Sequence, residues 1–324
     1  MKRRTFLGSF AALAASGFVG SAKAAWPERN IIAIVPFPPG GGLDLSARVI
    51  GNVLHKELGQ PFVVMNRPGA TGSLGTVAVA RSEPDGYNLL WGSLTSTAIF
   101  AALYRDTVQF DLNKDFSQVS VFGTVPFTFV VNPSVKANSV SELVALAKAK
   151  PGSITFATSG HGSIQHLAAE RFQRAAGVEM LHIPYKGIGP AMVDLLAGHV
   201  DMAIESLSAV MPHVRSGKLR ALAVTTKERF TLAPEIPTAS EAGLKDFEFG
   251  ANLFVAAPAG TPQPIVAKIN EAMNVAVSKP DVKDNLLSQA VVLKPNTLAE
   301  ATALVRAESA MWLDLIKSAN MRPQ

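Results

Sequence analysis

Three loops rich in glycine, serine and threonine each stand between a strand-like run and a helix-like run of this sequence. They occupy residues 39–44, 68–73 and 158–163, and none of them contains lysine or arginine. The start of a helix offers unpaired backbone N–H groups and a partial positive charge. Glycine lets a ligand come close to the backbone, and hydroxyl groups add further donors. These loops therefore suit a carboxylate or a similar small anion.

A single glycine-rich turn between a strand and a helix usually holds no ligand. Three such turns in one chain favour a shared cleft instead. The reason is that ligands of doubly wound sheets bind at the carboxyl ends of the strands, where these turns gather. The sequence therefore predicts one anion-binding cleft rather than three separate sites.

Isolated polar residues near these loops each have two interpretations. Asp44 either stabilises the first turn of its helix or contacts a ligand. Lys186 is either a solvated loop charge or the cation of the cleft. Glu205 follows an apolar run, and it either caps the next turn or receives a ligand ammonium or hydroxyl group. His166 is most simply a packing or surface residue.

Several enzyme motifs are missing from the sequence. It has no Walker phosphate loop, no Gly-x-Ser-x-Gly, no His-Glu-x-x-His and no Ser-x-x-Lys. It has no cysteine, which excludes thiolate chemistry and cysteine-ligated metals. His161 and His166 are five residues apart, which is not the spacing of a metal pair on one helix face. We therefore expect no metal, no cofactor and no catalytic residue.

The first 24 residues have the layout of an export signal. A basic start, MKRR, precedes an apolar stretch over residues 6–19, and Ala22-Lys23-Ala24 matches a small-x-small cleavage pattern. The pair Arg3-Arg4 also resembles a twin-arginine signal, so both that route and the general one are open. We expect cleavage near Ala24 and a periplasmic mature protein.

The charge of the chain lies mostly in this leader. The leader carries four of the 30 basic residues and none of the 25 acidic ones, so the rest of the chain is nearly neutral. A nucleic-acid-binding domain would carry an excess of basic residues. We therefore expect no nucleic-acid partner, and the charge does not point to a membrane surface.

The rest of the chain alternates short apolar runs with helical patterns. Residues 30–35, 61–65 and 87–91 are predicted strands, and helical patterns over 45–58 and 73–81 connect them. This rhythm predicts a parallel α/β sheet with right-handed crossovers.

Two further apolar runs suggest how the chain divides into domains. The run over residues 119–131 is interrupted by Gly123 and Pro126, so we do not expect one continuous strand there. We interpret it, with residues 252–257, as two crossings between domains. The predicted division is domain 1 over residues 25–124 plus 252–324, and domain 2 over residues 125–251.

A series of motifs along the chain resembles those of one protein family. They are residues 35–42 (VPFPPGGG) with Asp44 and 47–48, residues 66–70 with Gly72, residues 162–163 and 166–168, residues 184–187 (PYKG), residues 217–224 (GKLRALAV), residues 237–238 and 241–243, and residues 257–262 (APAGTP). In this order they resemble the tripartite tricarboxylate transporter substrate-binding proteins, also called Bug receptors. The resemblance runs from Val35 to about Trp312 and covers nearly the whole mature chain.

The resemblance implies a two-domain periplasmic binding protein of type II-like fold. Each domain would have a mostly parallel sheet flanked by helices, with the ligand cleft between the domains. Such a monomer, which is not an enzyme, closes on a small organic anion and delivers it to a membrane permease. The anion would be a di- or tricarboxylate, an acidic amino acid or an aromatic carboxylate. A sensory receptor that presents the ligand to a membrane signalling protein is the alternative.

The resemblance implies ligand contacts from the glycine-rich loops, from Phe37 and from residues 95–96 and 185–187, and we add Asp44 and Glu205 as candidates. They are Phe37, Gly40, Gly41, Gly42, Asp44, Ala70, Thr71, Gly72, Ser73, Thr95, Ser96, Ser159, Gly160, His161, Gly162, Ser163, Tyr185, Lys186, Gly187 and Glu205. Two positions depart from the family pattern: Leu43 stands where threonine is frequent, and Glu205 where aspartate is common. A hydrolase using His161 or His166 is a third hypothesis, against which the missing nucleophile pattern argues.

Overall fold

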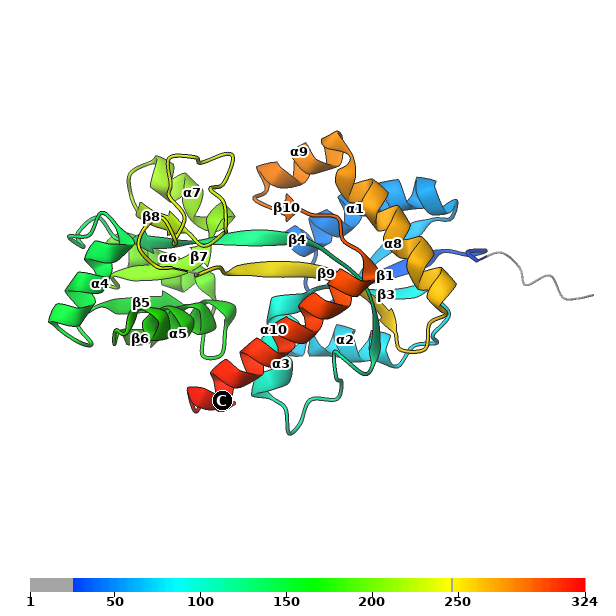
Figure 1. Cartoon of the computed structure of the whole chain (residues 1–324), viewed down its shortest axis with the longest axis horizontal. Coiled ribbons are helices and arrows are strands. Elements are labelled where there is room, and N and C mark those ends of the chain that lie inside the picture. Colours follow the sequence, from blue (N-terminus) through cyan, green and yellow to red (C-terminus); the bar gives the residue numbers. More distant parts are fainter. Residues whose placement is uncertain (1–25, 246, 324) are drawn as a thin grey trace, which may run out of the picture.

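The computed structural model describes residues 26–245 and 247–323. Figure 1 shows two lobes side by side along the long axis of the molecule, each with helices packed against a sheet. The predicted signal peptide, residues 1–24, lies outside the described residues. None of the described helices combines the length and the apolar character that a membrane crossing requires.

The first lobe is built on three parallel strands. These are β1 (Ile31–Val35), β2 (Phe62–Asn66) and β3 (Asn88–Ser93), with β1 in the middle. The helices after them are α1 (Gly42–Leu58), the short turn η1 (Ala70–Gly72) with α2 (Ser73–Ala80), and α3 (Leu94–Leu103). The parallel pairing predicted for these strands is confirmed. Each glycine-rich loop of this lobe therefore leaves the carboxyl end of a strand.

The C-terminal part of the chain completes the first lobe. It contributes α8 (Gln263–Ser278), α9 (Pro280–Ser288), β10 (Val292–Leu293) and α10 (Leu298–Ser318). The apolar side of α8 packs on the sheet of this lobe, and Ile269 and Met273 are fully buried there. The side chain of Thr297 caps α10 in a capping box with Glu300, which explains why that helix begins where it does.

The second lobe repeats the strand–loop–helix arrangement. Its strands are β5 (Thr155–Thr158), β6 (Leu181–Pro184), β7 (Met202–Ser206) and β8 (Arg220–Val224). Its helices are α4 (Val140–Ala149), α5 (Ile164–Ala176), α6 (Ile188–Ala197) and α7 (Leu207–Arg215). Strand β5 pairs in parallel with both β6 and β7. The loop over residues 158–163 thus leaves a central strand of this lobe.

Two long antiparallel strands join the lobes. They are β4 (Phe116–Val131) and β9 (Gly250–Pro258), and Figure 1 shows both running through the middle of the molecule. Our expectation of an interrupted strand is wrong, because β4 is continuous through Gly123 and Pro126. Register shifts near Ser120 and Gly123 absorb the irregularity. Pro126, which has no N–H to donate, pairs with Gly250 where β4 passes from β9 to β7 and β8.

Helix α10 packs along α3 and reaches the second lobe. Near its end, Arg174 of α5 donates a hydrogen bond to the hydroxyl of Ser318. Farther back, Glu308 is buried and accepts hydrogen bonds from Thr95 of α3, from Asn252 Nδ2 of β9 at 2.9 Å and from Trp312 Nε1 at 3.2 Å. Burial raises the pKa of the Glu308 carboxyl above its usual value. This network ties α3, β9 and α10 together beside the crossing strands.

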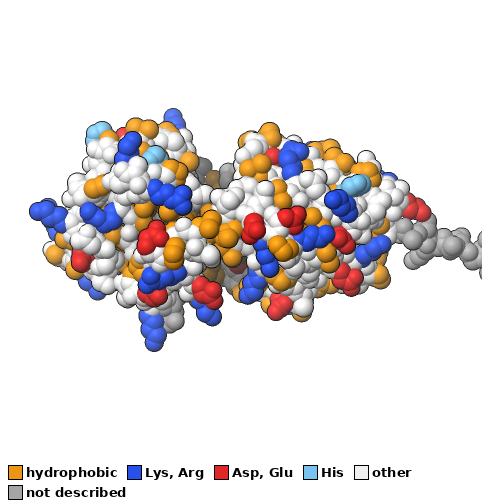
Figure 2. Space-filling view, turned by 90° about the horizontal axis from the view of Figure 1, so that it is seen from above, with side chains coloured by type: hydrophobic (Ala, Val, Ile, Leu, Met, Phe, Trp, Pro, Cys, Tyr) orange, Lys and Arg blue, Asp and Glu red, His pale blue; other side chains and the backbone are white. Residues whose placement is uncertain are grey.

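Figure 2 shows basic and acidic side chains interspersed over both lobes. This face has no large field of one sign. It therefore differs from the basic stripe or patch that a nucleic-acid-binding surface presents.

The core of the second lobe should depend strongly on Phe129. This side chain is fully buried in β4, and its ring centroid lies 4.9 Å from that of Phe172 and 5.5 Å from that of Phe247. We predict that Phe129→Ala lowers the free energy of unfolding by about 3–5 kcal/mol, because it leaves a cavity that the neighbouring rings cannot close. Urea unfolding followed by circular dichroism measures this loss.

Leu181→Ala is the matched control, because Leu181 is 53% exposed on β6 of the same lobe. It should change the free energy of unfolding by no more than about 0.5 kcal/mol. A loss for Phe129→Ala as small as that of the control would contradict this account of the core.

Candidate functional site

A cavity of about 330 Å³ lies between the two lobes. The first lobe contributes Thr71 and Ser96, and the second lobe contributes residues 159–165. One side of α3 forms the remaining wall, with Ile99, Phe100, Leu103 and Tyr104. Larger hollows of about 580 and 590 Å³ each lie on one lobe alone. We take the cavity between the lobes as the candidate site, because it alone among these three joins the predicted loops of both lobes.

Two helices border this cavity, one from each lobe. In α3 the side chain of Ser93 caps the helix and accepts from the Ser96 N–H at 3.2 Å. In α5 the side chain of Ser163 does the same for the His166 N–H at 3.2 Å. The first N–H groups of a helix have no carbonyl one turn earlier to donate to. The start of α5 therefore directs donors and partial positive charge at the cavity. Helix α3 instead lies along the cavity, which Ser96 of its first turn borders through its side chain.

Glycine is required at two places in the loop before α5. Gly160 and Gly162 have φ angles of 134° and 72°, in the region that side chains rarely adopt. A Cβ atom on Gly162 would lie 2.5 Å from Leu103 Cδ2 on α3. Glycine at this position thus allows the loop of the second lobe to come close to the first lobe.

Three stacked histidines support this loop from behind. The rings of His166 and His182 lie 3.9 Å apart and are nearly parallel, and the ring of His161 lies 4.6 Å from that of His166. His166 Nδ1 accepts from the Gly162 N–H at 3.1 Å, and His182 Nε2 forms a hydrogen bond of 2.7 Å with the hydroxyl of Thr158. The two inner imidazoles therefore fix both ends of the loop.

The same packing keeps these imidazoles neutral. Burial, and then the neighbouring rings of His182 and His161, lower the pKa of His166 from 6.5 to about 3. Burial, and then His161, lower the pKa of His182 from 6.5 to about 4. A neutral His166 can accept the Gly162 N–H, whereas a protonated one cannot.

The trio also has metal-ligating atoms close together, within 4.8 Å of one another. Nitrogen ligands of zinc bind at about 2.0–2.1 Å, and their lone pairs must converge on the ion. Here the rings of His166 and His182 are stacked, so their in-plane lone pairs run parallel. Their nitrogens also already hold the loop. We therefore do not assign a metal to this cluster. The sequence analysis did not predict the cluster, because His182 joins it only through the pairing of β5 with β6.

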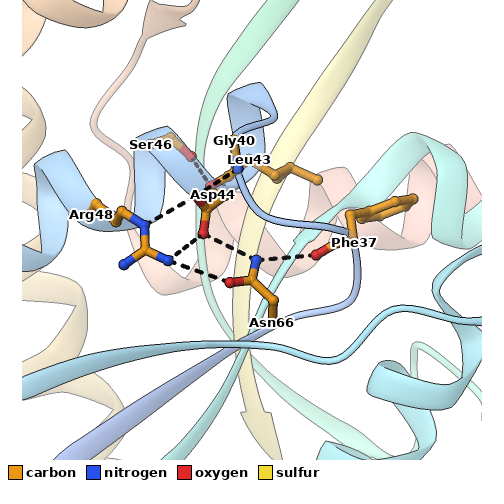
Figure 3. Close-up of polar contacts among 7 residues, drawn as sticks. All are labelled: Phe37, Gly40, Leu43, Asp44, Ser46, Arg48 and Asn66. Carbon is orange, nitrogen blue, oxygen red and sulfur yellow. Dashed lines mark hydrogen bonds and ion pairs between the residues drawn. The ribbon is translucent and has the colours of Figure 1, made fainter.

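Asp44 is occupied by donors of its own chain, as Figure 3 shows. Its carboxylate accepts two hydrogen bonds from Arg48, at 3.0 and 2.9 Å, and one each from the Gly40 N–H and from Asn66 Nδ2, both at 3.0 Å. The side chain is only 3% exposed. The hydrogen bond with Arg48 is the main cause that lowers the pKa of Asp44 to about 2. Asp44 thus organises the loop between β1 and α1.

Glu205 of the second lobe is likewise buried and hydrogen-bonded to donors of its own chain. It is 3% exposed, and burial raises the pKa of its carboxyl. One oxygen accepts from Gln165 Nε2 at 2.9 Å, and the other accepts from the N–H and the hydroxyl of Ser206 at 2.7 and 2.9 Å. Gln165 Oε1 in turn accepts from the Ser159 hydroxyl at 2.8 Å. Glu205 therefore stands behind Gln165, and Gln165 is the residue at the cavity.

The segment after β6 supports the loop rather than lining the cavity. The N–H groups of Tyr185 and Gly187 donate to the carbonyls of Thr158 and Ser159, at 3.1 and 3.2 Å. The Tyr185 hydroxyl donates to Asp194 at 2.6 Å, and burial, with that carboxylate, raises the pKa of Tyr185 to about 12. Lys186 is exposed.

Seven predicted residues come together at the cavity: Thr71, Ser96, Ser159, Gly160, His161, Gly162 and Ser163. The other predicted residues do not line it: Phe37, Gly40, Gly41, Gly42, Asp44, Ala70, Gly72, Ser73, Thr95, Tyr185, Lys186, Gly187 and Glu205. Thr95 faces Glu308 instead. The wall residues of α3, together with Ile164 and Gln165, were missed. After its first turn α3 is apolar throughout, so its sequence does not mark the side that meets the other lobe.

The sequence was compared with protein families and with known proteins. The sequence matches the family model described as "Tripartite tricarboxylate transporter family receptor" over residues 46–321. It is 39% identical to the protein BugT of Bordetella pertussis over 292 residues, which cover 90% of each chain.

Two solved structures of similar size resemble this one over nearly their whole length. One is Rpa4515 of R. palustris with adipate, at 33% identity and a TM-score of 0.77, covering 92% of this chain and 100% of that one. The other is MatC of Rhodopseudomonas palustris with bound malate, at 32% identity and a TM-score of 0.73, covering 90% and 100%. A further neighbour is described as a periplasmic transporter, at 34% identity and a TM-score of 0.77. The predicted α/β fold of a periplasmic binding protein is confirmed.

The histidine stack predicts a measurable loss of stability in acid. The pKa values of His166 and His182 lie below the unfolded value of 6.5, so the unfolded chain binds more protons below that pH. Their contribution is complete above about pH 6.5 and is lost progressively as the pH falls toward 4 and 3. We predict that His182→Asn flattens the fall of the melting temperature between pH 7 and pH 4.5.

The pH profile of the variant must be compared with that of the wild type, because other groups also change the stability in acid. The raised pKa values of Glu205 and Glu308 favour the folded state as the pH falls, which is opposite to the effect of the histidines. His55→Asn is the control, since His55 is exposed on α1. It should leave the wild-type pH profile unchanged. Identical slopes for His182→Asn and wild type would disprove this role of the stack.

Proposed function

Because this chain belongs to the tripartite tricarboxylate transporter receptor family, whose members are periplasmic solute-binding receptors and not enzymes, we propose that it captures a small carboxylate between its two lobes. The relatives with bound adipate and malate support a carboxylate ligand. The signal layout of residues 1–24 supports export to the periplasm.

One observation carries this proposal: the start of α5 faces the cavity from the second lobe, and Ser96 in the first turn of α3 borders it from the first lobe. The start of α5 supplies backbone donors and a partial positive charge, and the Ser96 hydroxyl would donate to the carboxylate from the other side. The hydroxyls of Thr71, Ser96 and Ser159 add side-chain donors around it. The loops with Gly40 to Gly42 and with Tyr185 would act from a second layer, by supporting the lining loops.

The crossing strands supply the means of closure in this proposal. Strands β4 and β9 join the lobes, and domain 1 (25–124 plus 252–324) and domain 2 (125–251) would turn about them. Closing would remove water from the anion and strengthen its hydrogen bonds. The closed, monomeric form would then deliver the anion to a membrane permease of the tripartite tricarboxylate type. The alternative is a sensory receptor that presents the ligand to a membrane signalling protein.

Thermal melting against a library of carboxylates tests the proposed function. A ligand at a hundred times its dissociation constant should raise the free energy of unfolding by about 2.7 kcal/mol and the melting temperature with it. Neutral amides of the same carbon skeletons are the control and should give no shift. If no carboxylate raises the melting temperature, the proposed function is wrong.

Ser96→Asp should separate binding from folding. Ser96 is the third residue of α3 and lines the cavity, so an aspartate there favours the helix start but repels an anionic ligand. Two charges 4 Å apart near a protein surface interact by about 4 kcal/mol before screening by salt. We predict at least about tenfold weaker carboxylate binding with an unchanged or higher melting temperature of the free protein, measured by calorimetry.

Ser96→Asn is the matched neutral variant, with nearly the same volume as aspartate. It should keep most of the affinity. Equal affinities for the Asp and Asn variants would show that no anion binds beside Ser96.

A further inference from the structure

One wall of the cavity is apolar and comes mainly from a single side of α3. Ile99, Phe100, Leu103 and Tyr104 lie at helical spacing on that side, below Ser96. The rings of Phe100 and Tyr104 are stacked, with centroids 4.6 Å apart. Ile164 at the start of α5 adds a further apolar side chain. The hydroxyls and the start of α5 thus occupy one part of the cavity, and hydrocarbon surface occupies another.

The cavity has no acidic side chain among its lining residues, all of which belong to the described part of the chain. The two carboxylates among the predicted site residues, Asp44 and Glu205, are each 3% exposed and accept hydrogen bonds from their own chain. Gln165, which covers Glu205, already accepts from Ser159 through its amide oxygen. The carbonyls of Thr158, Ser159 and Gly160 accept from other N–H groups of the protein.

We infer that the ligand is a carboxylate with an apolar aliphatic or aromatic body and without an ammonium group. This inference rests on the proposed function and narrows it, since acidic amino acids are among the anions that such receptors could take. It follows from the cavity's donors and hydrocarbon wall and from the lack of an acidic side chain among its lining residues.

The physical reason is electrostatic and does not depend on shape. An ammonium group placed here would lose its hydration and meet the positive start of α5, with no acidic side chain to compensate. A hydroxyl group of the same size carries no charge and costs far less to place. The apolar wall meanwhile favours ligands in proportion to the hydrocarbon area that they bury.

Three matched ligands test the exclusion of ammonium: 3-phenylpropanoate, phenyllactate and L-phenylalanine, measured by calorimetry with the full mature chain. They share the carboxylate and the ring, and differ at one substituent: hydrogen, hydroxyl or ammonium. We expect phenyllactate to bind within about tenfold of 3-phenylpropanoate, and phenylalanine at least about thirtyfold more weakly than phenyllactate. Adipate and 2-aminoadipate form a second pair with the same expectation.

Phenylalanine binding within threefold of phenyllactate, or more tightly, overturns the inference while the proposed function stands. If no anion of either series binds, the proposed function fails and the inference falls with it. A third measurement tests the apolar wall. Phe100→Ala should weaken 3-phenylpropanoate at least about tenfold but acetate less than about threefold, because acetate lacks the apolar body. Equal losses for both ligands would contradict the role of this wall.

Discussion

Backbone N–H groups at the start of a helix need partners, and this fold places the start of α5 at a cavity between the lobes. Ser163 satisfies the His166 N–H, which leaves the N–H groups of Ile164 and Gln165 for whatever enters the cavity. Ser96 of α3 borders the same cavity from the other lobe, so a bound anion would join the two lobes. Glycine at position 162 lets the loop before α5 approach Leu103 of α3. The crossing strands β4 and β9 join the lobes that carry these two helices.

Buried polar groups hold the arrangement without competing for the ligand. Asp44, Glu205 and Glu308 are each satisfied by donors of their own chain, and each supports a different element around the cavity. The neutral histidines hold the loop over residues 158–163 in the same manner. Because these groups are already paired, the cavity keeps donors and hydrocarbon but no free negative charge. This excess of donors over negative charge distinguishes an anion site from other polar clefts.

Local patterns in the sequence predicted the elements well but not the contacts between them. The loops, the parallel strands and the long helix α10 follow from turn residues, apolar runs and helical spacing. The continuous strand β4 did not, because its bulges and its change of partner depend on β9 and β7. Gln165 and the wall of α3 also escaped, since their roles depend on which side faces the other lobe. Asp44 was predicted either to stabilise the first turn of its helix or to contact a ligand. Its four hydrogen bonds, from Gly40, Arg48 and Asn66, show a role that the sequence did not predict, which is to organise the loop before α1.

A crystal structure with 3-phenylpropanoate bound tests the central claim most directly. The account predicts the carboxylate at the start of α5, within hydrogen-bonding distance of the Ile164 or Gln165 N–H and of the Ser96 side chain, with the ring against Phe100. A carboxylate bound instead at Gly40 to Gly42, away from α5, would contradict it.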